Sequence, residues 1–277
     1  MTRPLFIIGN KRSGTSQLVR LLNLHPQVFV SHESDIIWIL YQFHHELPFR
    51  AHPWDSDKGM RLTLKLCKHW LRREQSPRQN AFAVQRALME AGSPWLPPQR
   101  KTNLLWIGDK KPFQHTEPRL LAFLWENFPD AHFLHIIRHP CAVAASSDRF
   151  NRTRNGDFWL GLSAEEKVER WAFHESQVMS LRQAMPGRVH SLRYEDLCRR
   201  PADELSRVFE FLQVPPAPAA LAEAARQTHA AAGTVPFIRC SAEATRIAVS
   251  YSYDVQDPHC GSASGEGGGR AQQQCRW

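Results

Sequence analysis

Short apolar runs along the chain alternate with longer segments in which apolar residues recur every three or four positions. The run PLFIIG at 4–9 predicts a buried strand that ends in glycine, and SGTSQLVRLLNLH at 13–25 predicts a helix directly after it. Strand-like runs followed by helix-like segments recur at 28–30 and 35–43, 102–112 and 117–129, 131–140 and 140–150, and 187–197 and 201–214. This alternation predicts an α/β fold: a single domain with a central parallel sheet flanked by helices.

Two regions depart from the alternation. Residues from about 57 to 92 contain only helix-like segments, MRLTLKLCKHWLRRE and NAFAVQRALMEAG, so we expect a helical insertion there. Residues 256–277 are rich in glycine, serine and glutamine, which predicts a disordered tail. The folded domain is therefore expected to span residues 1–255.

The composition limits the classes of ligand. The chain of 277 residues is 42% hydrophobic and 22% charged, as is typical of a protein with a folded core. Its net charge of +8 suits an anionic ligand, which can be a phosphorylated or sulfated molecule, nucleic acid or an anionic membrane. The sequence has no RNA-binding aromatic motif, zinc-finger spacing or long Lys/Arg run, so we expect no nucleic-acid partner.

Cysteine usage and the N-terminus bear on location. The six cysteines form no C-x-x-C pair, and a domain of this length needs no disulfides, so we expect reduced thiols and a cytoplasmic protein. Only about five apolar residues precede the glycine loop, fewer than a signal peptide or a membrane span requires. We expect no membrane span, and the sequence leaves the oligomeric state open.

The loop GNKRSGTS at 9–16 has the outline of a phosphate-binding loop. Thr15 stands where a Walker A motif has lysine, and the cations are instead Lys11 and Arg12. Backbone N–H groups at the start of the following helix suit an anion, without the metal-bound triphosphate geometry of a P-loop kinase. A P-loop kinase or nucleotidase is therefore one alternative for this chain, and a non-catalytic polyanion-binding protein is another.

Two stretches carry a resemblance to a known family. IIGNKRSGTSQLVRLLNLHP resembles the 5′-phosphosulfate loop of sulfotransferases that use 3′-phosphoadenosine 5′-phosphosulfate (PAPS), and FLHIIRHPCAVAASSDRF resembles their 3′-phosphate motif. The resemblance covers about residues 4–213 and implies a sulfotransferase with PAPS as donor. It implies that the nucleotide is bound by Lys11, Arg12, Ser13, Gly14, Thr15, Ser16, Arg138 and Ser146, with Tyr194 of the RYEDL segment near the adenine.

Two further stretches of the sequence indicate which residues take part in the reaction. HPQVFVSHESDIIW resembles the tyrosylprotein branch of the family, which implies that Glu33 is the general base, with neighbouring His32 as the rival. GDKKPF resembles a lysine-containing segment of the same branch, which implies that Lys110 stabilises the transferring group together with Arg12. The expected reaction is in-line displacement of the sulfuryl group onto an acceptor hydroxyl, with no metal required.

Some positions depart from the family pattern. Lys11 replaces a common proline, Gln17 replaces an adenine-stacking tryptophan, and Asp35 stands where the tyrosylprotein branch has an arginine that helps to read an acidic peptide. The late basic segment of many sulfotransferases has no recognisable counterpart, and neither Arg239 nor Arg246 is assigned to its role. The acceptor stays open between a carbohydrate, a small alcohol or phenol, and protein tyrosine, and we expect the helical region 57–92 to form its pocket.

Overall fold

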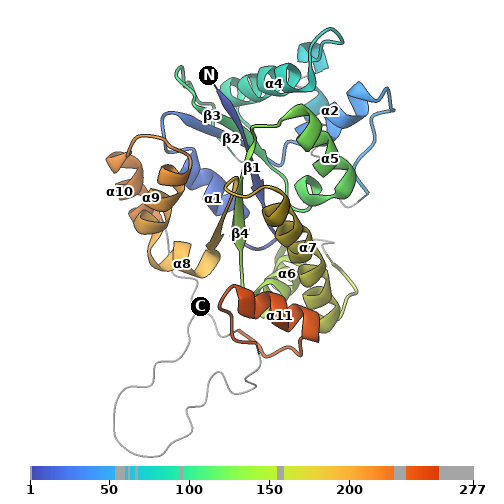
Figure 1. The fold of residues 1–277 in the computed structure, drawn as a ribbon, viewed down its shortest axis with the longest axis vertical. Helices are drawn as coiled ribbons and strands as arrows, with labels where there is room; N and C mark the ends of the chain where they lie inside the picture. The colour runs from blue at the N-terminus through green and yellow to red at the C-terminus, as the bar shows by residue number, and fades with distance from the viewer. Residues whose placement is uncertain are drawn as a thin grey trace, which may run out of the picture.

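A five-stranded parallel sheet runs through the middle of the molecule (Figure 1). The computed structural model describes residues 2–53, 60–61, 63–65, 68–93, 96–154, 159–227 and 235–255. The sheet has the order β2-β3-β1-β4-β5, and every neighbouring pair is parallel. Its strands are β1 (Arg3–Ile8), β2 (Val28–His32), β3 (Trp106–Lys110), β4 (His132–Ile137) and β5 (Val189–Arg193). The predicted α/β fold with a central parallel sheet is confirmed.

The strand order determines where a ligand site can form. After β1 the chain builds β2 and β3 on one side of it, and then crosses to build β4 and β5 on the other side. The connections after β1 and β4 therefore leave the sheet in opposite directions from two adjacent strands. In open α/β sheets, ligands bind at the carboxyl ends of the strands at such a point, and the loop of residues 9–14 starts there.

Helices cover both faces of the sheet because its strands are apolar on both sides. On β1, Phe6 and Ile8 belong to one buried cluster and Leu5 and Ile7 to another. The first cluster includes residues of α2 (Ile36–His44), α4 (Pro77–Ala91), α5 (Pro118–Asn127) and α7 (Ala164–Ala184). The second includes residues of α1 (Thr15–Leu22) and α9 (Pro201–Phe211), beside which α10 (Pro218–Gln227) lies (Figure 1).

The remaining elements lie around the carboxyl end of β4. They are α6 (Pro140–Arg154), α8 (Tyr194–Arg199) and α11 (Ala242–Ser250). The segment after α11, through Tyr253 and Val255, packs in a buried cluster with residues of α6 and α7. The turn expected after β5 is instead the short helix α8, which has Glu195 and Asp196 in its first turn, where a helix dipole favours negative charge.

Two predicted regions are described only in part or not at all. Within the expected insertion at 57–92, the structure describes α4 and a 3₁₀ turn, η1 (Lys68–Trp70). Helix α4 begins at Ser76, whose side chain accepts from the Gln79 amide in a capping box, and Pro77 follows as the first helical residue. The expected tail at 256–277 lies outside the described residues.

Candidate active site

The loop between β1 and α1 is a tight turn around buried polar residues. Asn10 is fully buried and donates to Glu175 Oε1 on α7 (2.6 Å), and the Ser13 amide donates back to the Asn10 carbonyl (3.2 Å). Ser13 Oγ is also buried and has no hydrogen-bond partner within the part of the chain that the structure describes. Helix α1 begins after this turn, so its first N–H groups and the Ser13 hydroxyl suit an anionic group.

Gly14 is the residue on which the shape of this loop depends. Its φ of 91° lies in the left-handed region, and a Cβ at this position would lie 2.2 Å from Cδ2 of Tyr194. The Tyr194 ring therefore packs directly against the loop backbone. The sequence prediction had assigned both residues to the nucleotide, and the fold brings them into contact across 180 positions of the chain.

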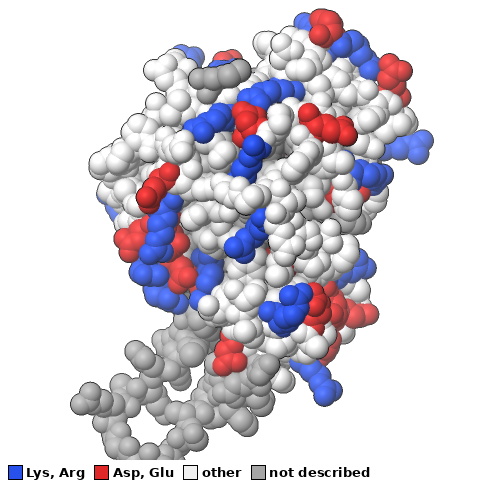
Figure 2. Space-filling model, in the orientation of Figure 1, with Lys and Arg blue, Asp and Glu red and all other residues white. Residues whose placement is uncertain are grey.

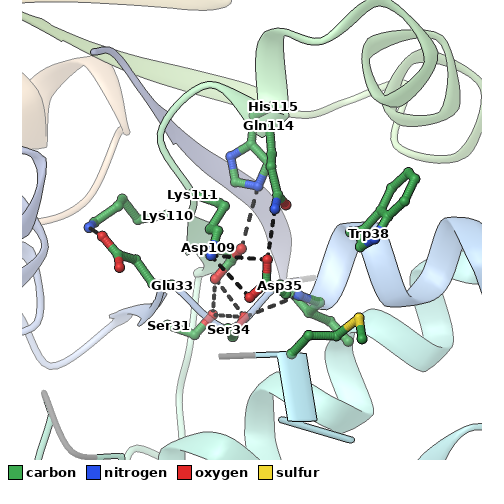
Figure 3. A network of polar contacts seen from close by, with 12 residues as sticks. Ser31, Glu33, Ser34, Asp35, Trp38, Asp109, Lys110, Lys111, Gln114 and His115 are labelled. Carbon is green, nitrogen blue, oxygen red and sulfur yellow. Dashed lines mark hydrogen bonds and ion pairs between the residues drawn. The ribbon is translucent and has the colours of Figure 1, made fainter. Parts of the chain in front are cut away.

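Glu33, Lys110 and Ser16 converge at the start of α1. Strands β2 and β3 are neighbours with His32 opposite Lys110, so the residues at their carboxyl ends meet. Lys110 Nζ lies 2.7 Å from Glu33 Oε1 and donates to Ser16 Oγ (3.1 Å); Figure 3 shows the pair of Glu33 and Lys110. The Lys110 side chain is fully buried, whereas that of Glu33 is 39% exposed, so the carboxylate is the member of the pair that solvent reaches.

The charge states in this cluster follow from burial and from the Lys110 ammonium. Burial alone would raise the pKa of Glu33, but the attraction of Lys110 outweighs it and lowers this pKa to about 2. Burial, and then repulsion by Lys110, lowers the pKa of His32 to about 4. At neutral pH Glu33 is therefore ionised and His32 is neutral, with His32 Nε2 lying 2.9 Å from Ser16 Oγ.

A second, buried ion pair supports the turn that carries Glu33. Glu33 and Asp35 both have a positive φ, of 49° and 56°, a conformation that the surroundings must stabilise. The Glu33 amide donates to the Lys110 carbonyl (2.9 Å), and Lys111 Nζ lies 3.0 Å from the Asp35 carboxylate, which also accepts from Gln114 (2.7 Å) (Figure 3). Thus Lys110 and Lys111, at the end of β3, pair with Glu33 and Asp35, which follow β2.

Asp109, the β3 residue before Lys110, extends this network into the buried core. Its carboxylate accepts from Ser31 Oγ (2.6 Å) and Ser34 Oγ (2.7 Å), and its second oxygen lies 3.4 Å from His115 Nε2. All four residues are buried, so the network fixes the backbone from 31 to 35 from within the core. Sequence analysis missed this network because Ser31 and Ser34 lie 78 and 75 positions from Asp109 in the chain.

The residues expected at the 3′-phosphate lie at the other side of the loop. Arg12 Nε donates to Ser146 Oγ of α6 (3.3 Å), and Arg138 Nη1 donates to the Arg12 carbonyl (3.0 Å). The Arg138 guanidinium also stacks over the Tyr194 ring, 4.6 Å from its centre. Burial raises the pKa of Tyr194 to about 12, so its hydroxyl stays protonated. The fold therefore gathers Arg12, Arg138, Ser146 and Tyr194 into one group.

The other predicted loop residues occupy the start of α1 and its rim. Thr15 is buried in the first turn of α1, beside Ser16. Lys11 Nζ lies 5.8 Å above the ring of Phe113, which stacks on His174 of α7 with 3.7 Å between ring centres. Lys11 thus lies at the rim of the loop, next to an aromatic stack that the sequence did not indicate.

The charged side chains bear on the metal and polyanion alternatives. No group of three or more His, Cys, Asp or Glu residues able to hold a metal ion occurs within the described ranges. Figure 2 shows that Lys and Arg alternate with Asp and Glu around α8 and α9, where Arg199 pairs with Asp196 within α8 and Arg207 with Glu204 within α9. The positive charge in this area is paired, so it does not form an extended basic surface there.

None of the described helices is both long and apolar enough to cross a membrane.

Comparison with known proteins gives one family match and several similar structures. A model of the sulfotransferase family matches residues 4–218. The structure resembles the sulfotransferase domain of the curacin biosynthetic pathway, with a TM-score of 0.60 and 21% identity over 92% of this chain and 99% of that chain. It also resembles the sulfotransferase domain of the Synechococcus PCC 7002 olefin synthase, with a TM-score of 0.58 and 21% identity over 91% and 96% of the two chains.

A third similar structure is a sulfotransferase from Alicyclobacillus acidocaldarius, with a TM-score of 0.52 and 21% identity over 78% of this chain and 83% of that chain. No curated protein sequence is significantly similar to the chain. Neither the P-loop kinase nor the polyanion-binding alternative is favoured by these matches. Because the family model matches residues 4–218, which is most of the sequence, the chain belongs to the sulfotransferase family.

Proposed function

We propose that the protein transfers the sulfuryl group of PAPS to the hydroxyl of an acceptor, with Glu33 as general base and Lys110 and Arg12 as the stabilising cations. The observation that carries the proposal is the convergence of Lys110 Nζ on Glu33 (2.7 Å) and on Ser16 (3.1 Å) at the start of α1. A base, a cation and an anion-binding helix start within one hydrogen-bond network are the groups that sulfuryl transfer requires.

The donor would lie along the loop and the group at the end of β4. Residues Lys11 to Ser16 would hold the 5′-phosphosulfate, Arg138 and Ser146 the 3′-phosphate, and Tyr194 would lie near the adenine. The buried Ser13 hydroxyl supports this fit, because it has no hydrogen-bond partner among the described residues and can donate to an anion. Gly14 supports it because the missing Cβ lets the Tyr194 ring pack against the loop. Arg12 contacts Ser146 through its side chain and Arg138 through its carbonyl, which supports a single ligand spanning both motifs.

PAPS supplies a sulfuryl group bonded to a phosphate that departs as the acceptor oxygen attacks. Glu33 accepts the proton of the acceptor hydroxyl, and Lys110 and Arg12 neutralise the negative charge that develops on the departing phosphate. In the free protein the Lys110 ammonium keeps the pKa of Glu33 at about 2, which makes it a weak base. When Lys110 turns toward a second anion, burial acts on Glu33 with less opposition, and its pKa rises toward the range of an effective base.

His32 is the second candidate for the base. It is neutral at pH 7 and shares the Ser16 hydroxyl with Lys110, so it can also accept a proton. We favour Glu33 because the resemblance to the tyrosylprotein branch implies a base at this position and because its side chain is accessible to solvent. Parallel Glu33→Gln and His32→Gln variants separate the two roles.

The acceptor is a hydroxyl compound, and we propose a small alcohol, phenol or carbohydrate ahead of protein tyrosine. Asp35 is only 2% exposed and is paired with Lys111, so position 35 offers no cation to an acidic peptide.

We also propose that residues 1–255 form the sulfotransferase domain, which a chain truncated after Val255 tests by retained nucleotide binding. A cytoplasmic location stays a prediction from the cysteine content, and cell fractionation checks it.

The deciding experiment is thermal unfolding with 3′-phosphoadenosine 5′-phosphate (PAP), beside Mg-ATP and a salt control. A ligand at a hundred times its Kd stabilises by about 2.7 kcal/mol, which raises Tm by several degrees. We expect a shift with PAP alone; a shift only with Mg-ATP, or none, contradicts the proposal. Glu33→Gln should then lower turnover of labelled PAPS by about 10²- to 10⁴-fold on a panel of alcohols, with PAP affinity retained, and unchanged turnover removes Glu33 as the base.

A further inference from the structure

The segment that follows α11 contacts the backbone on which the nucleotide residues are mounted. Tyr253 Oη donates to Glu195 Oε2 (2.6 Å) and lies 3.2 Å from the carbonyl oxygen of Ile137. Tyr253 is 3% exposed and Glu195 is 5% exposed, so both groups are shielded from water. A charge-assisted hydrogen bond of this length in a buried site is among the stronger polar contacts in a protein.

The same carboxylate reaches the other side of Arg138. Glu195 Oε1 accepts from the backbone N–H of His139 (3.0 Å), while Tyr253 binds Ile137. Ile137 and His139 are the immediate neighbours of Arg138, and Glu195 directly follows Tyr194, whose ring stacks under the Arg138 guanidinium. The Tyr253 hydroxyl and the Glu195 carboxylate therefore hold the backbone on both sides of Arg138. Through Glu195 they link this backbone to the segment that carries Tyr194.

Further contacts hold Tyr253 in this position. The Arg193 guanidinium lies over its ring, 4.3 Å from the centre, and the next carbonyl, that of Asp254, lies 3.0 Å from His139 Nε2. Burial raises the pKa of Tyr253, so the hydroxyl remains a donor at neutral pH. The described part of the segment, residues 251–255, contains no Lys or Arg, so its contribution is to the orientation of residues already there.

We infer that Tyr253 and Glu195 are positioning residues that orient Arg138 toward the 3′-phosphate, so that the segment after α11 helps the protein to prefer a 3′-phosphorylated nucleotide. The inference rests on the proposed function of Arg138. It gives the C-terminal part of the domain a role that no motif in its sequence indicates. A positioning role predicts a loss that is specific to nucleotides with a 3′-phosphate.

Tyr253→Phe tests this because it removes only the hydroxyl and leaves the ring under Arg193. Tyr251→Phe is the matched control: Tyr251 lies on the same segment, is 9% exposed, and its hydroxyl contacts Arg182 (3.4 Å) rather than the nucleotide group. Calorimetry would give the Kd of PAP and of adenosine 5′-monophosphate for each protein. We expect Tyr253→Phe to weaken PAP binding by about tenfold, the order expected for one lost hydrogen bond to a charged group, with monophosphate binding unchanged.

The outcomes separate the inference from the proposed function. Wild type without a preference for PAP contradicts the proposed nucleotide site itself. A wild-type preference that Tyr253→Phe retains in full, or an equal loss of both nucleotides, overturns the positioning role and leaves the nucleotide site standing. Glu195→Gln is the second variant, since it keeps the shape and weakens both contacts, and should shift the preference in the same direction. In kinetics the KM for PAPS should rise much more than kcat falls, and Tyr251→Phe should change neither.

Discussion

The buried pair of Asp35 and Lys111 gives a stability prediction that the structure defines closely. Lys111 Nζ lies 3.0 Å from both carboxylate oxygens, and the side chains are 2% and 5% exposed. At this distance and an effective dielectric constant of about 20, the two charges attract by about 5.5 kcal/mol. Removing one partner leaves the other charge buried without this counter-charge, so Asp35→Asn and Lys111→Met should each lower the free energy of unfolding by about 3–5 kcal/mol.

The double variant should lose much less than the sum of the two single losses, because neither buried charge of the pair is then left without its counter-charge. Urea unfolding of the four proteins gives the coupling free energy of the pair, which we expect at about 3 kcal/mol or more. The exposed pair of Arg246 and Glu243, whose side chains are 59% and 51% exposed, is the matched control and should show no measurable coupling. Additive losses at Asp35 and Lys111 would refute the view that this pair acts as one unit under the Glu33 turn.

Two further predictions concern the loop and the base. Gly14→Ala places a Cβ against the Tyr194 ring at a φ of 91°, so it should displace the ring from Arg138 and abolish PAP binding in calorimetry; wild-type affinity in this variant would contradict the observed packing. The lowered pKa of Glu33 means that its ionised form stabilises the fold at neutral pH, and this contribution is lost as pH falls from its usual value of 4.5 through about 2. The stability difference between wild type and Glu33→Gln should therefore be constant above pH 5 and shrink below pH 4. Urea unfolding midpoints at each pH measure this difference. A difference that does not change with pH would show that Lys110 leaves the pKa of Glu33 unchanged.

The fold was predictable from local patterns because its central strands are short, apolar and followed by amphipathic helices. The apolar run at 4–8 and the glycine after it gave the correct element and the correct loop, since both depend on neighbouring residues only. The same reasoning predicts a turn after the strand within 187–197, where the structure has the helix α8 (Tyr194–Arg199). Tertiary contacts of Glu195 stabilise this single short helix, and such contacts leave no periodic signal in a segment of six residues.

The supporting residues of the site could not be predicted for a similar reason. Asp35 was noticed only as a departure from the family pattern, whereas the structure gives it a partner 76 positions away in Lys111. Tyr253 follows a segment without a recognisable motif, and its hydroxyl binds a carboxylate 58 positions earlier. Each of these residues depends on one specific long-range contact, and composition or spacing within a window cannot identify such a contact.

The position of Arg12 explains why two separate motifs form one site. It lies in the loop after β1 with a φ of 70°, which turns its carbonyl toward Arg138 and its side chain toward Ser146, both of which follow β4. The motifs are 126 residues apart at Arg12 and Arg138, and only the adjacency of β1 and β4 in the sheet brings them together. The sequence specifies each motif locally, but the strand order β3-β1-β4 decides that a ligand can touch both. The proposed donor, PAPS, carries its phosphosulfate and its 3′-phosphate at the 5′ and 3′ positions of one ribose, so it has the two anionic groups that a ligand touching both motifs needs.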